Sequence, residues 1–338
     1  MMLILYLLAA LALAISIDAT FGDPRNRYHP VSWLGRIIDL SVMHLKSTNS
    51  MSTERGGNGK NTTARRERMI GIIYAIYLTT AIVLLVHFAA LLTLHLVGAL
   101  ALLALTALIL KVTIAVKGME RHALSILCCL AENNIASARS NLAMIVRRDT
   151  DDLDAQHVLS ATIECVSEST VDGITSPLFY FSLLGPAGAI GYRVINTLDS
   201  MIGYKDEYFC NIGWMSAKFD TAANYIPARI TAFFMIASSM ILGADWKNSV
   251  QILKRDRAKT FSTNGGYPMA TMAGALRVRL EKIGHYSLGE EQEPISVAKC
   301  KTAISIMKLT TSLFCFGFVA PIMTILYLIG WWSILFGV

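Results

Sequence analysis

The stretch IGIIYAIYLTTAIVLLVHFAALLTLHLVGALALLALTALILKVTIAV (residues 70–116) decides the fold class of this chain. Its 47 residues include no carboxylate, and Lys111 is their one lysine or arginine. A helix that crosses a membrane needs about 20 apolar residues, so the stretch predicts two spans. His87 and His95 lie within it without acidic or cysteine neighbours, which favours packing between helices over a ligand role.

The composition of the whole chain supports this interpretation. Hydrophobic residues make up 54% of the 338 residues and charged residues only 16%, and the mean hydropathy is +0.49. Because a soluble domain has about 25% charged residues, this chain lacks the polar residues that would cover a water-exposed surface. Length and composition therefore favour one bundle of membrane helices over two soluble domains.

Both ends of the chain carry further apolar runs. Residues 2–17 are apolar up to Asp18 and lack the basic region and cleavage site of a signal peptide, so we expect a first membrane helix there. Residues 309–338 predict one more span, with room for a second. Trp331 and Trp332 are expected at a membrane interface.

Two apolar segments in the middle of the chain are interrupted by helix-breaking residues. Segments 174–195 and 226–244 contain Pro177, Gly185, Pro186, Gly188, Gly191 and Pro227. Such interruptions are typical of re-entrant or kinked segments that are buried in protein. We therefore predict an all-α, polytopic membrane helix bundle with about four to six membrane segments, including re-entrant or kinked ones, and with cytoplasmic helical regions.

The net charge of +6 is concentrated in one stretch. Residues 46–68 hold six lysines and arginines, are rich in Ser, Asn, Gly and Thr, and predict a mobile loop that stays in the cytoplasm. No aromatic residues are interleaved with these charges, so nucleic acid is not an expected partner. The six cysteines form no CxxC pair, which predicts reduced thiols without a disulfide framework.

These patterns divide the chain into four parts. Residues 1–117 hold the N-terminal membrane helices with the basic loop 46–68. Residues 118–243 hold an acidic helix and the broken apolar segments, residues 244–308 form a polar, basic region with an Asn/Gly loop, and residues 309–338 form a C-terminal membrane segment.

An acidic stripe lies in the second part. On a helix over residues 154–168, the side chains of Asp154, His157, Ala161, Glu164 and Glu168 fall within about 80° of each other. The stripe has no lysine or arginine, whereas a solvated helix face usually mixes signs. Closely spaced carboxylates favour a cation between them, which predicts Mg²⁺ held by Asp149, Asp154, Glu164 and Glu168. An ordinary solvated helix face is the alternative.

Three further groups of polar residues follow. Asn196, Asp199 and Ser200 share one helical face before Lys205. A second group is Lys218-Phe219-Asp220, with Asn224 and Arg229 after it, and the arginine and Lys205 can equally snorkel at an interface. The third is the loop at 262–268, which precedes a small-residue helix and would present N–H groups to an anion. A plain turn with an N-cap explains that loop equally well.

Motifs along nearly the whole chain resemble the CobD/CbiB family. The N-terminal motif is Gly22-Asp23-Pro24 followed by His29-Pro30-Val31, and the most specific block is Asn196-Thr197-Leu198-Asp199-Ser200-Met201-Ile202-Gly203-Tyr204-Lys205. Central blocks also match at Glu168–Gly173, Pro177–Tyr180, Ala223–Arg229 and Asn264–Leu276. Two positions depart from the common pattern, since Met269 stands where many members have Glu and Ser169 replaces a common Asn.

The resemblance implies an adenosylcobinamide-phosphate synthase. Such enzymes join adenosylcobyric acid to (R)-1-aminopropan-2-ol or its O-phosphate through an amide bond, with consumption of ATP. The implied cofactors are therefore ATP and Mg²⁺. The implied partners are the corrinoid, the amino alcohol and the lipid bilayer of the cell membrane, and the sequence leaves room for a homo-oligomer.

The resemblance and the patterns together nominate the site residues. Expected in catalysis are Glu164, Glu168, His157, Asp172 and Lys205. Expected to bind substrate or cofactor are Asp23, His29, Asn196, Asp199, Asn224, Arg229, Asn264, Gly265 and Gly266.

A membrane transporter of a small solute or corrinoid precursor is the main alternative, because it would also explain broken helices with polar residues. The path of segment 174–195 through the membrane determines whether the two blocks can form one active site. If segment 174–195 crossed the membrane fully, the acidic stripe and the block 196–205 would lie on opposite sides. We therefore expect this segment to be re-entrant, with both blocks on the cytoplasmic side.

Overall fold

The computed structural model describes residues 2–24, 26–54, 60–204 and 206–337. The first half of the chain contains α1 (Met2–Phe21), η1 (Asn26–Tyr28), α2 (Pro30–Glu54), α3 (Lys60–Leu96), α4 (Ala99–Thr113), α5 (Val116–Ala131), α6 (Ile135–Ala143) and α7 (Ala155–Thr170). After them come η2 (Val171–Thr175), α8 (Ser176–Ile202), α9 (Trp214–Ala223), α10 (Tyr225–Ile241), α11 (Trp246–Asp256) and α12 (Gly266–Leu276). The chain ends with β1 (Arg279–Lys282), β2 (Tyr286–Gly289), α13 (Val297–Phe314), η3 (Cys315–Val319), α14 (Ala320–Leu328) and α15 (Trp331–Phe336).

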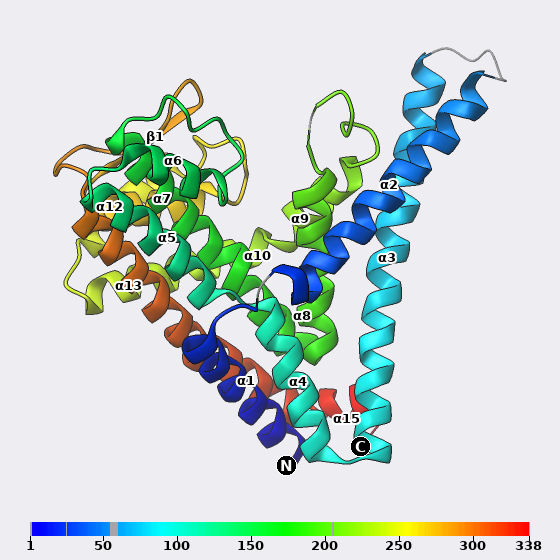
Figure 1. Ribbon diagram of the computed structural model, residues 1–338. Helices are drawn as coiled ribbons and strands as arrows, with labels where there is room; N and C mark the ends of the chain where they lie inside the picture. Colours follow the sequence, from blue (N-terminus) through cyan, green and yellow to red (C-terminus); the bar gives the residue numbers. More distant parts are fainter. Residues whose placement is uncertain (1, 25, 55–59, 205, 338) are drawn as a thin grey trace.

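Within the described part of the chain, five helical segments are long and apolar enough to cross a membrane, which confirms the predicted membrane helix bundle. They cover Leu3–Phe21, Ala64–Leu96, Ala99–Ala131, Ala155–Ile202 and Val297–Leu328. The 70–116 stretch forms two of them, as predicted, with a turn at Gly98, whose φ is 108°. Figure 1 shows the long α2–α3 pair on one side and α5, α7, α12 and α13 gathered on the other.

The prediction of a loop over residues 46–68 is wrong for most of that stretch. Helix α2 continues to Glu54 and α3 begins at Lys60, and residues 55–59 lie outside the described part of the chain. Lysine, arginine and glutamate are good helix formers, and α2 and α3 pack against each other as a helical pair. Pairing and propensity together outweigh the Ser, Asn and Gly content that suggested a loop.

Helix α8 turns back on itself at Gly185. This residue has φ 64° and ψ −152°, a conformation open almost only to glycine, and Pro186 follows it. On the two sides of the bend, the hydroxyls of Ser176 and Tyr192 donate to the same atom, Oδ1 of Asn224, at 2.6 and 2.9 Å. In a straight helix, two residues 16 positions apart would be separated by about 24 Å along the axis. The predicted kink in this segment is therefore confirmed, and both of its ends lie at one end of the bundle; its re-entrance into a membrane stays a prediction.

The C-terminal tryptophans pack around this bend. Trp331 donates its indole N–H to the carbonyl of Leu183 at 2.7 Å. Trp332 is buried and donates to the carbonyl of Met323 at 3.0 Å. The expectation that both rings sit at a membrane interface is thus wrong for Trp332, because closing the bend of α8 requires apolar side chains behind Gly185.

The polar end of the bundle contains one element that the sequence patterns did not indicate. Strands β1 and β2 form an antiparallel hairpin in which Lys282 pairs with Tyr286. Both side chains reach the site described below. The four-part division of the chain stays a prediction, and α5 and α13 run across two of its boundaries.

Replacing Gly185 with alanine is expected to destabilise the fold by about 1–3 kcal/mol, because the added Cβ strains a backbone with positive φ. A Cβ there has ordinary contacts of 3.5 Å or more, so the cost comes from the backbone. The measurement is thermal unfolding of the purified protein in detergent. Gly35→Ala, on a regular helix with its nearest neighbour at 3.6 Å, is the matched control and should not lower the stability.

The bend also predicts the topology of the chain. Cysteines introduced at the exposed positions Asp154 and Ser200 should react with an impermeant maleimide from the same side of sealed vesicles. A cysteine at Val97, in the turn between α3 and α4, should react from the other side. The labelled positions are identified by mass spectrometry, with the exposed Cys128 replaced by serine. Reaction of positions 154 and 200 from opposite sides would contradict a re-entrant α8.

Candidate functional site

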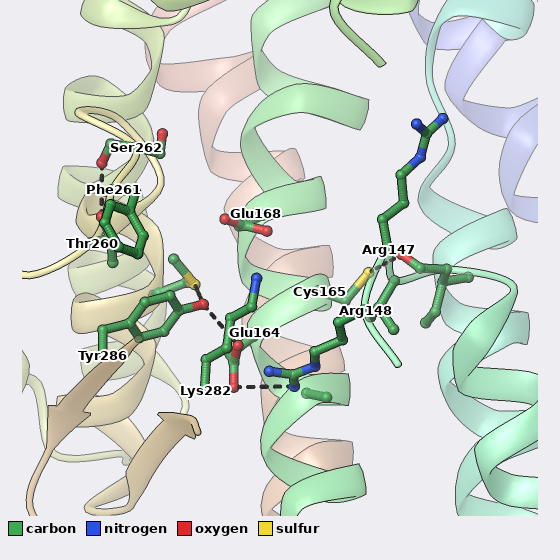
Figure 2. Close-up of a pocket in the computed structure, with 14 residues that line it drawn as sticks. Arg147, Arg148, Glu164, Cys165, Glu168, Thr260, Phe261, Ser262, Lys282 and Tyr286 are labelled. Carbon is green, nitrogen blue, oxygen red and sulfur yellow. Dashed lines mark hydrogen bonds and ion pairs between the residues drawn. The ribbon is translucent and has the colours of Figure 1, made fainter. Parts of the chain in front are cut away.

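A charged cavity of about 290 Å³ opens at the polar end of α7 (Figure 2). Its walls come from α7, the segment before it, the loop before α12, α12 itself and the β-hairpin. The lining residues are Ile145, Val146, Arg147, Arg148, Ala161, Glu164, Cys165, Glu168, Thr260, Phe261, Ser262, Met269, Lys282 and Tyr286. Lys282, Arg148 and two carboxylates therefore face one small space, whereas the guanidinium of Arg147 is directed away from it and stacks on the Tyr204 ring at 4.5 Å.

Glu164 is held by several donors. Its Oε2 accepts from the Tyr286 hydroxyl at 2.8 Å, and its Oε1 accepts from the Ser160 hydroxyl at 2.9 Å and lies 3.7 Å from Arg148. Burial and the neighbouring carboxylates raise the pKa of Tyr286, so its hydroxyl stays protonated and donates. These contacts give the Glu164 carboxylate one orientation.

Glu168 lies one turn further along the same face of α7 and differs from Glu164 in its hydrogen bonding. It makes no hydrogen bond or ion pair with any described residue, and Figure 2 shows its carboxylate standing alone above Glu164. Lys282 likewise has no such partner within the described part of the chain and exerts an electrostatic attraction on Glu168. Both groups have their hydrogen-bonding capacity available to a ligand.

Glu168 and Ser262 also line a second, smaller cavity of about 50 Å³, so the two spaces are neighbours. The smaller cavity is lined by Asp172 and Asp220 and by the end of the Asn/Gly loop. Asp172 makes no hydrogen bond or ion pair with any described residue. Burial raises the pKa of Asp220, while hydrogen bonds from Asn196 at 3.3 Å and Asn224 at 3.1 Å lower it.

The N–H groups of the Asn/Gly loop are hydrogen-bonded to acceptors within the protein. The backbone N–H groups of Asn264 and Gly265 donate to the Ser262 hydroxyl at 3.3 and 3.0 Å. The Asn264 amide donates to the carbonyl of Thr221 at 2.8 Å and accepts from Arg229 at 3.4 Å. These N–H groups are therefore committed to a turn, which favours the plain-turn alternative over an anion cradle.

The two glycines of this loop are required for close packing. A Cβ on Gly266 would lie 2.1 Å from the carbonyl oxygen of Arg257, and one on Gly265 would lie 2.8 Å from Oε1 of Glu168. Gly265 thus keeps the loop against Glu168 without covering its carboxylate. Gly265 lines the smaller cavity, and the predicted binding role of both glycines stays a prediction.

The predicted four-carboxylate metal set is not gathered. Asp154 caps α7, because its Oδ1 accepts from the N–H of His157 at 2.8 Å, and Asp149 accepts from the N–H of Asp151 at 3.0 Å. Among the described residues, no three His, Cys, Asp or Glu side chains meet in a way that could hold a metal ion. The free N–H groups at the start of α7 need an acceptor, so Asp154 is used as a cap.

The remaining predicted residues separate into different places. His157 lines another cavity with Arg279 and Glu281 and is bonded to Asp154, so it does not face Glu168. Asp23 and His29 line a fourth cavity, between α2, α5 and α8. Lys205 lies outside the described residues.

Asn196, Asn224 and Arg229 are placed around the smaller cavity. Asn196 and Asn224 support Asp220, and Arg229 reaches Asn264 and stacks on the Tyr267 ring with its guanidinium carbon 4.3 Å from the centroid. Asp199 attracts Arg147 of the charged cavity.

Sequence reasoning did not nominate several residues that form the site. Arg147, Arg148 and Asp220 stood within stretches that were singled out, but without assigned roles. No sequence pattern pointed to Lys282 and Tyr286, because a pair of four-residue strands in a basic region shows no usable periodicity.

Comparisons with known proteins cover most of the chain. The family model described as CobD/Cbib protein matches residues 11–313. The chain is 38% identical over 306 residues to the "Probable cobalamin biosynthesis protein CobD" of Methanothermobacter thermautotrophicus, which covers 90% of this chain and 95% of that protein. It is 37% identical over 283 residues to the "Cobalamin biosynthesis protein CobD" of Dehalococcoides mccartyi, at 84% and 87% coverage. No solved structure matches the chain.

Asp256 holds the hairpin that carries Lys282 and Tyr286. It is fully buried, accepts from the N–H of Gly289 at 2.8 Å, and pairs with Arg255 at 2.7 Å and Lys259 at 2.6 Å. Burial alone would raise the pKa of Asp256, but these partners lower it to about 2.

Because the folded-state pKa of Asp256 lies below the ordinary value of 3.8, its stabilising contribution is complete above about pH 4 and is lost as the pH falls toward 2. Asp256→Asn should therefore lower the unfolding free energy by about 2 kcal/mol at pH 7. The difference from the wild type should shrink at pH 3, measured by thermal unfolding in detergent. A difference that is the same at both pH values would contradict this account.

Proposed function

The chain belongs to the CobD/CbiB family of cobalamin biosynthesis proteins, and from this membership we propose that it is the ligase that forms the amide between adenosylcobyric acid and (R)-1-aminopropan-2-ol or its O-phosphate. ATP is consumed in the reaction. The observation that carries the proposal is the charged cavity, in which Glu168, without a partner among the described residues, faces Lys282 and Arg148.

The cations suit the first half of such a reaction. A carboxylate is a poor acyl donor, so it must first become an acyl phosphate or an adenylate. Arginine and lysine bind phosphate oxygens through charge-assisted hydrogen bonds, and Lys282 has no competing partner among the described residues. A space of about 290 Å³ is near the lower end of ligand pockets, which run from about 300 to 1,000 Å³. It suits a phosphate chain, with the corrin ring outside the mouth.

The two carboxylates of α7 suit different roles in the second half. The attacking amine is an ammonium at neutral pH and must lose a proton before it can attack. Glu168 has free lone pairs in the cavity and can accept that proton. Glu164 is occupied by Tyr286, Ser160 and Arg148, so we assign it to positioning Arg148. His157 faces another cavity and is not assigned the proton.

Mg²⁺ fits the smaller cavity better than the predicted acidic stripe. Asp172, without a described partner, and Asp220, whose pKa is raised by burial, line that space. Mg²⁺ is commonly bound by one or two carboxylates together with substrate phosphates, and these two would hold it. When bound, the ion would neutralise phosphate charge.

Orientation follows from the need for ATP. Since the bend in α8 brings both cavities to one end of the bundle, we propose that this end faces the cytoplasm of the cell.

The direct test supplies purified protein in detergent with adenosylcobyric acid, the amino alcohol phosphate, ATP and Mg²⁺. Mass spectrometry should show the mass of the amide, formed only when ATP is present. A folded protein that yields no product would overturn the ligase proposal. Passage of the corrinoid precursor across vesicles without ATP would then favour a transporter.

Glu168→Gln is expected to reduce the rate of amide formation by about 100-fold or more, because it removes the proton acceptor and keeps the shape of the side chain. Glu132→Gln, the same change at an exposed position at the end of α5, is the matched control and should leave the rate unchanged. The thermal stability of both variants should match that of the wild type. A nearly normal rate for Glu168→Gln would remove Glu168 from the catalytic role.

A further inference from the structure

A separate cavity of about 490 Å³ lies away from the one that carries the proposed chemistry. It is formed by the segment after α1, the start of α2, one face of α5 and one residue of α8. Its lining residues are Asp23, Pro24, His29, Val31, Ser32, Gly118, Arg121, His122, Ser125 and Arg193. The proposed mechanism uses none of them.

Asp23 is the carboxylate in this lining, and its charge is balanced by the buried Lys111. Lys111, which is itself buried, lies 2.7 Å from Oδ1 of Asp23 and 3.1 Å from Oδ1 of Asp18. His29 lies 3.9 Å from the same Asp23 oxygen. Burial raises the pKa of Asp23, but the hydrogen bond from Lys111 and the nearby His29 outweigh it and hold the pKa below its usual range. Asp23 therefore stays ionised, and its charge is offset by Lys111.

This arrangement needs a close approach of the chain to α5. A Cβ on Gly118 would lie 2.2 Å from Oδ2 of Asp23, so only glycine allows the carboxylate to sit against the helix. The backbone N–H of Lys117 donates to Asp18 at 2.9 Å and anchors the start of α5 beside the ion pairs. The Asp18–Lys111–Asp23 group is thus a fixed wall of the cavity.

The remaining basic groups in the lining are two arginines and two histidines. Arg121 and His122 are exposed on α5, and the hydrogen bond that Arg121 makes within the described part of the chain goes to the carbonyl of Phe21 at 3.1 Å. Arg193 enters from α8. Its Nε is buried without a hydrogen-bond partner in the described part of the chain, and its only hydrogen bond there is a long one of 3.4 Å to Asn196. Arg193 is half-buried, and a buried guanidinium N–H without an acceptor is costly unless a ligand supplies one.

We propose that this cavity is a binding site for a phosphate group, with Arg193 as the inner anchor and Arg121 and His122 as the outer contacts. Arginine donors match phosphate oxygens in geometry and charge. Asn196 bonds to Arg193 on one side and to Asp220 on the other, so this phosphate site is directly linked to the smaller cavity.

Two molecules could supply the phosphate. One is a small soluble phosphate monoester, for which the amino alcohol phosphate is the candidate if the proposed function holds. The other is a lipid headgroup, since the cavity adjoins the end of the apolar α1. Both would be recognised by the same donors, and the experiment separates them.

The test uses the full chain with Ser125→Cys, which places a thiol in the lining. In a detergent without phospholipid, inorganic phosphate should slow maleimide alkylation at position 125, compared with chloride at equal ionic strength. Alkylation of the native Cys210, which is absent from this lining, should not change. Mass spectrometry assigns the label to each position.

Arg193→Gln in the same background should raise the half-protecting phosphate concentration by about tenfold or more, the effect of removing a hydrogen bond to a charged group. Arg279→Gln, an arginine outside this cavity, is the matched control and should leave protection intact. If Arg193→Gln does not fold, Arg121→Gln at the rim should weaken protection in the same direction.

Each outcome decides the proposal. Protection by inorganic phosphate that depends on Arg193 supports a site for a soluble phosphate. Protection only in nanodiscs of anionic phospholipid, absent in nanodiscs of neutral glycolipid and dependent on Arg193, supports a lipid headgroup. No protection by either, or protection that survives both Arg193→Gln and Arg121→Gln, overturns it.

The result is separate from the proposed reaction, because alkylation needs no turnover. Protection without amide formation would defeat the ligase proposal alone. Amide formation without protection would defeat the phosphate site alone.

Discussion

The side chain of Asn224 is the constraint on which the site depends. Its Oδ1 accepts from Ser176 and Tyr192, on the two arms of α8, and its Nδ2 donates to Asp220. A buried amide oxygen with both acceptor positions filled keeps the two arms together. The bend at Gly185 turns the chain around, and Asn224 closes it. Without that closure, the acidic face of α7 and the Asn196 block would lie at opposite ends of a long helix, and a single site could not form.

The chemistry of the charged cavity comes from a contrast between two glutamates on one helix face. Glu164 is held by Tyr286 of the hairpin and by Ser160, while Glu168, one turn later, has no described partner. The hairpin that makes this distinction depends on the buried Asp256. A small strand pair far along the sequence thus decides which carboxylate is structural and which is available to a substrate.

The polar end of the bundle is organised as linked cavities instead of one large cleft. Glu168 and Ser262 stand between the charged cavity and the smaller one. Arg193, Asn196 and Asp220 connect the smaller cavity to the phosphate site beside α5. The proposed ligase would have to hold several anionic groups apart until they react, and separate small pockets meet that need.

The sequence by itself determined the membrane helices, the break in the middle of the chain and the family, because apolar runs and a ten-residue motif are local signals. Helical periodicity also placed Glu164 and Glu168 on one face of α7. Local patterns could not show that Asp154 would be used as a cap, or that residues 46–54 and 60–68 would continue two paired helices. They also could not show that Tyr286 would reach Glu164 from 122 residues away. Only the tertiary structure decided which charged groups are satisfied and which are left for a ligand, because that depends on partners brought together from distant parts of the chain.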